Sequence, residues 1–285
     1  MHAAGLPHRA LLSAAALAAA AAAAAISLPA HAEEKPLWEF GLGAGVLAFN
    51  DYRGAATTHA YPVPIPYLVY RGKFFKSDRN GIRRILVGRY RVELNLSVNG
   101  TTPVRNDSAR SGMPDLRPTL EVGPQLEAHL WRNTDERVKL DLRVPLRASF
   151  TVEAVPHVVG VFLAPNVNLD IGQHPGTYGW KLGLLAGPLF ADRRYDGYFY
   201  SVAPQYASAG RPAYTAAGGY AGTQVLAALT RRYPSYWLGA FVRYDTLAGA
   251  SFAASPLVKR DSYWTAGVAA AWIIRRSTRL ADSDE

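Results

Sequence analysis

RVKLDLRVPLRASFTV, residues 137–152, alternates between two kinds of side chain along its whole length. Val138 and every second residue after it are apolar, whereas the positions between them are charged or hydroxyl-bearing, with one proline. Successive side chains of a β-strand point to opposite faces, so a strand here has one apolar and one charged face. A helix would scatter Lys139, Arg143 and Arg147 among the apolar groups, and the period of two therefore predicts a strand.

The same period of two recurs through most of the chain after residue 32. Further strands are expected at residues 38–48, 90–99, 119–131, 157–171, 179–191, 219–230, 235–248 and 262–274, with one or two within 62–87 and one near 197–206. Bacterial single-chain membrane barrels have even strand numbers. The pattern predicts an all-β fold, a single transmembrane antiparallel β-barrel of about ten to twelve strands.

Strand length and the polar faces favour a membrane barrel over a soluble protein. At roughly 3.3 Å per residue, residues 137–152 would span about 50 Å, far beyond a usual strand. The polar faces carry charges of both signs, which would pair inside a narrow lumen because isolated charges are costly there. The candidate lumen-facing residues are Glu93, Glu127, His129, Lys139, Asp141, Arg143 and Arg147.

Aromatic side chains gather near the ends of the expected strands, among them Trp38, Trp131 and Trp272. This placement is typical of the aromatic girdles that mark membrane interfaces. The alternative is a soluble antiparallel barrel or sandwich whose polar face is simply in contact with water.

The two ends of the chain differ from the region between them. Residues 1–32 have the features of a secretory signal: Arg9 near the start, an alanine-rich apolar stretch and the cleavage site Ala30-His31-Ala32. The alternative is an N-terminal membrane anchor. We expect a cleaved signal peptide at 1–32, a barrel over 33–274 and a polar C-terminal tail over 275–285. A mean hydropathy of −0.04 excludes a polytopic helical membrane protein.

The composition excludes several kinds of site. The absence of cysteine excludes a disulfide framework, a thiolate zinc site and a cysteine nucleophile. The four histidines after residue 32 are His59, His129, His157 and His174, far apart in the sequence, so we expect no metal site and no cofactor. The net charge is +9, but the basic residues are dispersed and often lie beside acids, which argues against a nucleic-acid partner.

An outer-membrane hydrolase is the alternative that requires chemistry. Its triad would draw on Glu127, His129 and Ser149, which would have to form a chain of hydrogen bonds from acid to base to nucleophile. The chain has no G-x-S-x-G motif. Glu127 and His129 are also spaced like any two polar residues on one strand face, and we therefore expect no enzymatic activity.

Turn-forming residues separate the expected strands. Residues 78–81 contain Asn80-Gly81, a favoured hairpin turn, and residues 133–136 join two of the clearest strands. Residues 100–117 are rich in proline, serine and glycine and indicate a surface loop. Residues 191–218 lack a clean period and are interpreted as a partly extended loop region.

The strongest candidate interaction motif lies in that last region. It comprises Asp192, Arg193, Arg194, Tyr195, Tyr198 and Tyr200. Paired arginines suit a phosphate or carboxylate, and tyrosines suit contact surfaces. The structural alternative is that Asp192 pairs with an arginine while the aromatic residues form a girdle or plug. Arg83-Arg84 and Arg231-Arg232, near expected turns, are either contacts for anionic lipid A or murein groups, or ordinary solvated charges.

Several segments resemble the MipA/OmpV family of outer-membrane proteins. They are residues 38–45, 51–54, 64–72, 187–195, 198–202, 211–214, 217–220, 237–245 and 255–258, of which GPLFADRRY at 187–195 is the strongest match. The resemblance covers essentially all of the chain after residue 32. One departure is the end of the chain, where Trp272 is followed by a polar tail instead of a terminal aromatic residue.

The resemblance implies an outer-membrane location and a scaffold role. The founding member of the family is regarded as a scaffold that brings together a lytic murein transglycosylase and a bifunctional penicillin-binding protein, and other members are described as adhesins or antigens. The expected partners are therefore these two enzymes, together with outer-membrane lipid and lipopolysaccharide. The alternatives are a small-solute pore and a surface adhesin.

Overall fold

The computed structural model describes residues 36–71, 76–78, 81–83, 87–89, 92–172 and 179–279. The expected signal peptide at 1–32, the centre of the turn at 78–81, Arg84, His174 and the tail beyond 279 lie outside these residues. Within the described ranges, no helix is both long enough and apolar enough to cross a membrane.

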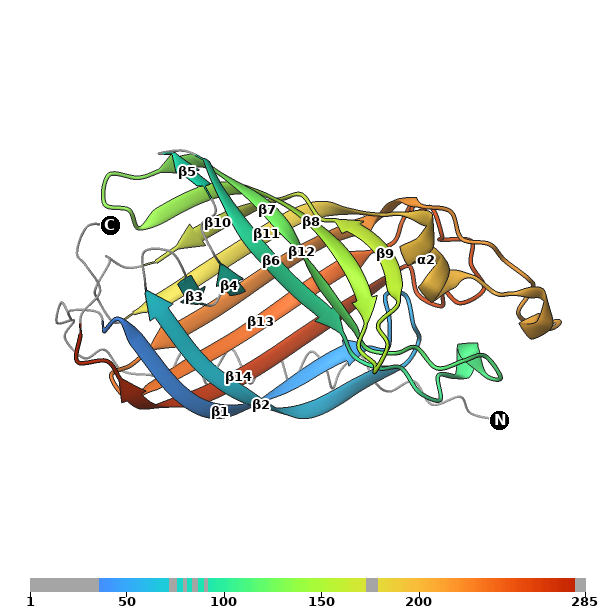
Figure 1. Ribbon diagram of the computed structural model, residues 1–285, viewed down its shortest axis with the longest axis horizontal. Helices are drawn as coiled ribbons and strands as arrows, with labels where there is room; N and C mark the ends of the chain where they lie inside the picture. Colours follow the sequence, from blue (N-terminus) through green and yellow to red (C-terminus); the bar gives the residue numbers. More distant parts are fainter. Residues whose placement is uncertain are drawn as a thin grey trace, which may run out of the picture.

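Fourteen strands form one antiparallel sheet in the described part of the chain (Figure 1). The long strands are β1 (Trp38–Asn50), β2 (Thr58–Arg71), β6 (Val92–Thr101), β7 (Thr119–Arg132), β8 (Val138–Thr151), β11 (Trp180–Ala191), β12 (Gly219–Arg232), β13 (Tyr236–Thr246) and β14 (Ser262–Arg276). The short strands are β3 (Lys76–Asp78), β4 (Gly81–Arg83), β5 (Val87–Arg89), β9 (Val158–Leu163) and β10 (Asn166–Ile171).

The sheet curls back on itself into a barrel. Its spatial order is β4-β3-β2-β1-β14-β13-β12-β11-β10-β8-β7-β6-β5, with β9 between β8 and β11. The first and last long strands pair directly, with Leu42 opposite Trp272 and Ala48 opposite Ala266. On the other side, β4 packs against β6. The prediction of an all-β, antiparallel, barrel-like fold is confirmed.

The number of strands differs in detail from the sequence-based expectation. The segment expected as one strand at 157–171 is divided into β9 and β10 around Ala164-Pro165. Proline has no N–H to donate to a strand ladder, which accounts for the interruption. Counted with this divided strand as one, the described long strands number ten, and β3, β4 and β5 are three-residue additions.

The alternating apolar and charged residues of β8 are alternately exposed and buried. Arg147 is 8% exposed, whereas the neighbouring Leu146 is 46% exposed. Asp141 is buried, and Leu140 and Leu142 lie on the opposite, outward face. Other apolar side chains exposed on the outside include Leu42, Val46, Leu120, Leu126, Val225 and Val268. An apolar outer surface around a charged interior is the arrangement of a membrane barrel.

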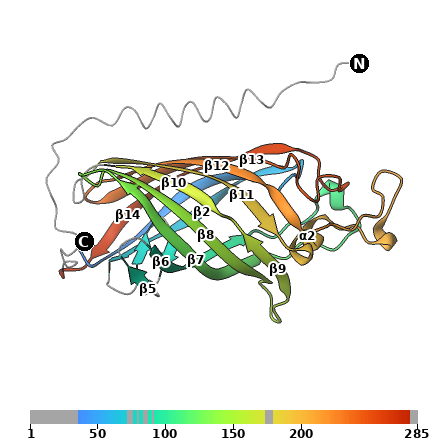
Figure 2. The same cartoon turned by 90° about the horizontal axis from the view of Figure 1, so that it is seen from above.

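The two ends of the barrel are built differently, as Figure 2 shows. At one end, short turns at residues 133–137 and 233–235 join the strands, and the described ends of the chain lie there too. We call this the short-turn end. At the other end lie four longer segments, residues 51–57, 102–118, 192–218 and 247–261, which we call the loop cap.

The loop cap contains the main apolar core of the described residues. Its centre is a short helix, α2 (Arg193–Tyr200), accompanied by the 3-10 turns η1 (Ser108–Arg110) and η2 (Pro204–Tyr206). The strand expected near 197–206 is therefore wrong, because α2 occupies residues 193–200. Residues 201–218 are loop with isolated β-bridges, such as the one between Val202 and Tyr214, which agrees with the partly extended loop expected over 191–218. Buried side chains from all four segments meet around α2; they include Tyr52, Leu116, Phe199, Tyr200, Phe252 and Leu257. Burying these aromatic rings stabilises a helix that its sequence alone disfavours.

Candidate functional site

The interior of the barrel is filled with paired charges, beginning at the short-turn end. Glu39 on β1 is fully buried and accepts two hydrogen bonds from Arg232 on β12, from Nη2 to Oε1 at 2.9 Å and from Nε to Oε2 at 3.1 Å. The Tyr67 hydroxyl on β2 donates to the same carboxylate at 3.1 Å. Because β13 and β14 separate β12 from β1 in the sheet, this ion pair connects two strands that are not neighbours, through the interior of the barrel.

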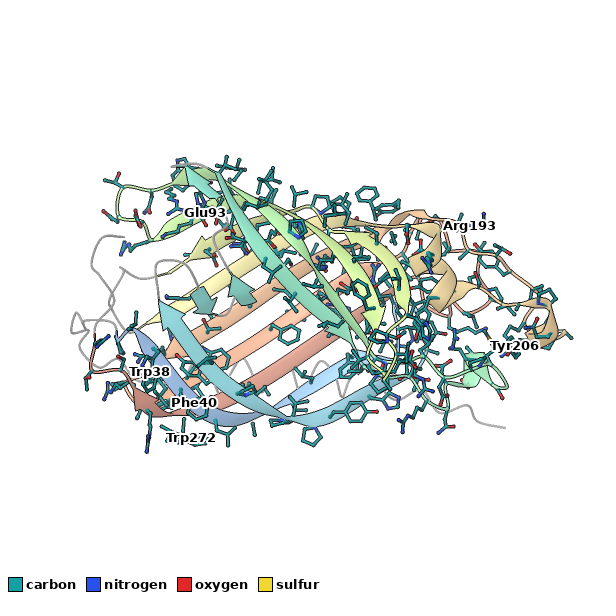
Figure 3. The ribbon with its side chains drawn as sticks, viewed as in Figure 1. Trp38, Phe40, Glu93, Arg193, Tyr206 and Trp272 are labelled. Atoms are coloured by element: carbon teal, nitrogen blue, oxygen red, sulfur yellow. The ribbon has the colours of Figure 1, made fainter. Side chains whose placement is uncertain are left out.

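A second cluster joins β6, β7 and β8, and Figure 3 labels one of its members, Glu93. His129 Nδ1 lies 2.8 Å from Asp141 Oδ1, and its Nε2 lies 3.3 Å from Glu93 Oε1. A neutral imidazole has one N–H, so the tautomer decides which of the two carboxylates receives its hydrogen bond. Beside them, Arg143 Nε donates to Glu127 at 3.2 Å, and Arg143 Nη2 lies 3.8 Å from Asp141.

A third group of paired charges connects the barrel wall to the loop cap. Arg147 Nε donates to Glu121 at 3.0 Å, and the Tyr195 hydroxyl of α2 donates to the other oxygen of that carboxylate at 2.8 Å. On the opposite wall, Asp245 accepts from Arg243 at 2.7 Å and lies 3.5 Å from Arg53 of the loop cap. Each of these carboxylates is almost fully buried and has a cation beside it, as a buried charge requires.

The sequence-based lumen candidates divide into two groups. Glu93, Glu127, His129, Asp141 and Arg143 lie together in one cluster, and Arg147 lies nearer the loop cap. Lys139 does not join them, because its Nζ donates to Glu136 in the adjoining turn at 3.2 Å. Sequence reasoning missed Glu39, Glu121 and Asp245 as partners, and it treated Arg232 as a turn charge although it pairs with Glu39.

Glu127, His129 and Asp141 have the residue types of a metal site, with ligand atoms within 4.8 Å of one another. Their donor atoms are already in contact with protein groups, since Arg143 lies against both carboxylates and Asp141 contacts the imidazole. The guanidinium thus supplies the positive charge that a bound cation would bring.

Glu127, His129 and Ser149 do not form the catalytic triad that was considered as an alternative. Ser149 lies opposite Glu121 in the β7–β8 register, whereas His129 lies opposite Asp141. Eight residues of strand separate Asp141 from Ser149, a distance of roughly 26 Å along β8. The His129 imidazole contacts Asp141 and Glu93, so the proposal that His129 activates Ser149 is wrong.

The candidate motif of residues 192–200 is mainly a structural element. Asp192 caps α2, accepting from the Tyr195 backbone N–H at 2.7 Å, in place of the arginine pairing considered above. Tyr195 bonds Glu121, the Tyr198 hydroxyl lies 3.2 Å from the Arg117 carbonyl, and Tyr200 donates to the Arg53 carbonyl at 3.0 Å. Arg193 and Arg194 are exposed, and Figure 3 labels Arg193 at the outer side of the helix.

The electrostatics of α2 follow from its burial. Burial raises the pKa of Tyr195 and Tyr200 well above the ordinary tyrosine value. It also raises the pKa of Asp196 to about 7, and the Ser251 hydroxyl, which donates at 3.3 Å, offsets only part of this effect. Asp196 is 1% exposed, so α2 contains a carboxyl group that titrates near neutrality.

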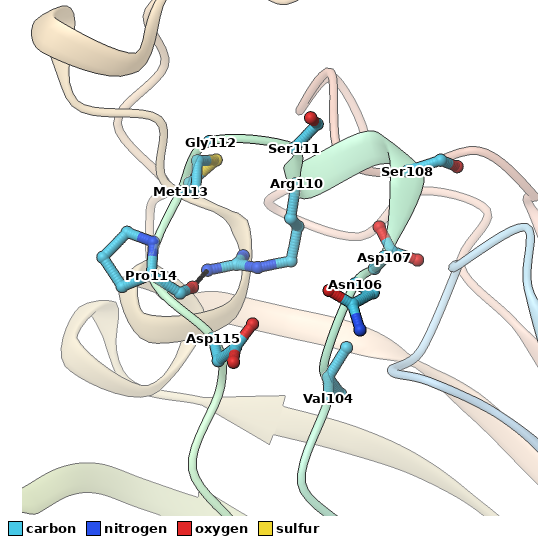
Figure 4. Close-up of a pocket in the computed structure, with 10 residues that line it drawn as sticks. All are labelled: Val104, Asn106, Asp107, Ser108, Arg110, Ser111, Gly112, Met113, Pro114 and Asp115. Atoms are coloured by element: carbon cyan, nitrogen blue, oxygen red, sulfur yellow. Dashed lines mark hydrogen bonds between the residues drawn. The ribbon is translucent and has the colours of Figure 1, made fainter.

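The loop between β6 and β7 lines a small, partly open pocket of about 270 Å³ (Figure 4). Arg110 extends across it and donates from Nη1 to the Phe199 carbonyl at 2.9 Å, while Nη2 lies 3.4 Å from the Pro114 carbonyl. Burial lowers the pKa of this guanidinium. Arg110 thus joins the 102–118 segment to α2, a role that the sequence did not indicate.

The segments that build this interior and its cap coincide with a known family. The family model described as MltA-interacting protein MipA matches residues 42–274, from within β1 to near the end of β14. The chain belongs to the MipA family. No curated protein matches this MipA-family chain. Its membership and its strand-rich fold fit an outer-membrane protein.

Proposed function

We propose that this MipA-family chain is a non-enzymatic outer-membrane β-barrel that serves as a scaffold for murein-remodelling enzymes, a lytic transglycosylase and a bifunctional penicillin-binding protein. The observation that carries the proposal is the family match over residues 42–274, whose description names an interaction with MltA. The charged interior supports it, because its acids and bases are paired with one another. Export through a cleaved signal peptide at 1–32 belongs to the same proposal.

The construction of the two ends indicates which surface would dock an enzyme. Outer-membrane barrels have short periplasmic turns and longer extracellular loops. The short-turn end then faces the periplasm, where murein lies. The loop cap faces the exterior, where the exposed Arg193 and Arg194 can meet lipopolysaccharide phosphates. The enzyme-docking surface is therefore the short-turn end and not the motif at 192–200.

Tag insertion at the two ends tests this arrangement. A short peptide tag inserted between Thr134 and Asp135, both exposed, obstructs the short-turn end. A matched tag between Ala209 and Gly210, also exposed, obstructs the loop cap instead. Exposed turn tips tolerate insertions, so both variants should assemble. From detergent extracts, the untagged protein and the 209–210 variant should capture a lytic transglycosylase or a penicillin-binding protein, and the 134–135 variant should not.

Two results would count against the proposal in different ways. Repeated capture of neither enzyme by the untagged protein would remove the scaffold role and leave the barrel unaffected. Loss of capture only in the 209–210 variant would assign docking to the loop cap and overturn the orientation.

A further inference from the structure

A basic groove lies at the short-turn end, where the first and last described segments of the chain run together. Leu37 N–H donates to the Arg279 carbonyl and Ser277 N–H donates to the Trp38 carbonyl, both at 2.8 Å. A groove of about 600 Å³ lies over this junction. Three arginines line it, Arg275, Arg276 and Arg279, and all three are exposed.

Apolar side chains border the groove on the outer surface of the barrel. Phe40 is 45% exposed, Trp272 62% and Ile274 60%. The paired strands β1 and β14 carry these residues, with Phe40 opposite Arg275. Figure 3 shows Trp38, Phe40 and Trp272 at the same end of the barrel. A cluster of guanidinium groups thus lies directly beside an exposed aromatic and aliphatic surface.

We propose that this groove binds an anionic glycerophospholipid of the periplasmic leaflet. Its phosphate lies on the guanidinium groups, which match phosphate geometry with planar pairs of N–H donors. Its acyl chains run along Phe40, Trp272 and Ile274. A soluble anion would use only the basic half of this surface, and an uncharged lipid only the apolar half. The proposal rests on the proposed function, because the barrel must span the outer membrane for the short-turn end to lie beside the periplasmic leaflet.

Lipid retention tests the proposal. The full mature chain is reconstituted in vesicles of equal parts phosphatidylglycerol and phosphatidylcholine, and lipids retained on the barrel are counted by native mass spectrometry. The wild type should retain phosphatidylglycerol in preference to phosphatidylcholine. The Arg275→Gln/Arg279→Gln variant should lose about fivefold of this preference for each arginine, the usual effect of a basic residue near an anionic surface. The variant Arg275→Lys/Arg279→Lys should keep most of it.

The control is Arg105→Gln/Arg260→Gln, which removes two exposed arginines from the loop cap. An unchanged preference in Arg275→Gln/Arg279→Gln, or an equal loss in the control, would overturn the proposal. Heat-modifiable migration of the same samples reports insertion separately, so an inserted wild-type barrel without lipid preference refutes the groove and not the barrel. Should Arg275→Gln/Arg279→Gln fail to insert, Arg279→Gln alone, beyond the end of β14, provides the same comparison.

Discussion

Among the buried acidic side chains of the described residues, Asp196 differs from three glutamates inside the barrel. Glu39, Glu121 and Glu127 each accept a hydrogen bond from an arginine. Asp196 instead receives a single bond from Ser251, and its Oδ1 has no hydrogen-bond partner. Burial disfavours the charged form of Asp196, and the Ser251 hydrogen bond and the nearby Arg53 charge offset only part of this effect, so its pKa rises to about 7.

This pKa predicts a pH-dependent loop cap. Because the pKa is higher in the folded cap than in the unfolded chain, the folded cap binds the proton more tightly. The contribution of Asp196 to the stability of the cap is therefore fully present below the unfolded pKa of 3.8 and is lost as the pH rises through about 7. Asp196→Asn removes the charge and should stabilise the cap at pH 8, by about 1–3 kcal/mol for relief of a poorly satisfied buried group, with little effect at pH 4. Limited proteolysis of residues 201–218 at both pH values measures the difference.

Asp115→Asn provides the control, because this carboxylate is exposed in the same cap. Its cleavage rate should follow that of the wild type at both pH values. If Asp196→Asn slowed cleavage equally at pH 4 and pH 8, the effect would not come from titration.

At the scale of single residues, the sequence predicts which face of a strand a charged side chain occupies. It does not predict which residue that side chain pairs with. Alternation in residues 137–152 places Asp141, Arg143 and Arg147 on one side of a strand. Which acid each one meets depends on strand register and on the curvature of the wall. Glu39 and Arg232 are 193 residues apart, and only barrel closure brings them together. The strand expected at 38–48 already placed Glu39 on the face opposite Trp38 and Phe40, but nothing in the sequence pointed to Arg232 as its partner.

At the scale of single elements, β1 and β14 form the closing contact of the barrel. Gly41, Gly43 and Gly45 lie on the side of β1 that approaches β14 most closely. A Cβ at Gly43 would overlap the Ala270 carbonyl oxygen and would lie 2.5 Å from Ala271 Cα. These are backbone atoms that a side chain cannot displace, so β1 needs glycine at this position.

We therefore predict that Gly43→Val prevents closure, whereas Ala44→Val does not. Ala44 is exposed on the apolar outer face, where a valine adds only lipid-facing surface. The measurement is the fraction of protein that migrates as a folded barrel without heating. Gly43→Val should reduce this fraction severely, and Ala44→Val should leave it near the wild-type value. Equal assembly of both variants would show that β1 and β14 can separate without loss of the barrel.

Helix α2 was not predicted from the sequence, and its composition explains why. Its residues, Arg193–Tyr200, include three tyrosines, a phenylalanine and Gly197, which are weak helix formers. The helix exists because Tyr195, Phe199 and Tyr200 are buried by segments distant in the sequence; Tyr200, for example, stacks on Phe252 with ring centroids 3.7 Å apart. The one local indication was Asp192, a favoured N-cap residue.

At the scale of the whole molecule, side chains occupy the interior of the barrel near both ends. The Glu39–Arg232 pair connects β1 and β12 inside the barrel near the short-turn end, and the apolar core of the loop cap lies at the other end. Barrels of about eight strands are filled by side chains, whereas 16–18 strands leave a channel. The ten long strands described here lie nearer the filled limit.

We accordingly predict that the purified protein gives no stable single-channel steps in planar bilayers. Insertion should be verified on the same preparation by heat-modifiable migration, and a general porin in the same bilayer is the positive control. Reproducible steps would favour the small-solute pore, the alternative that sequence considerations left open.

The pairing of β1 with β14 also constrains the order of events during biogenesis. Residues at opposite ends of the chain, such as Leu42 and Trp272, must meet before the wall can close. Contacts so remote in sequence form slowly. On the export route proposed above, the chain therefore has to remain unfolded until its final segment has been translocated. A chain arrested before residue 262 would lack β14, the closing strand, altogether.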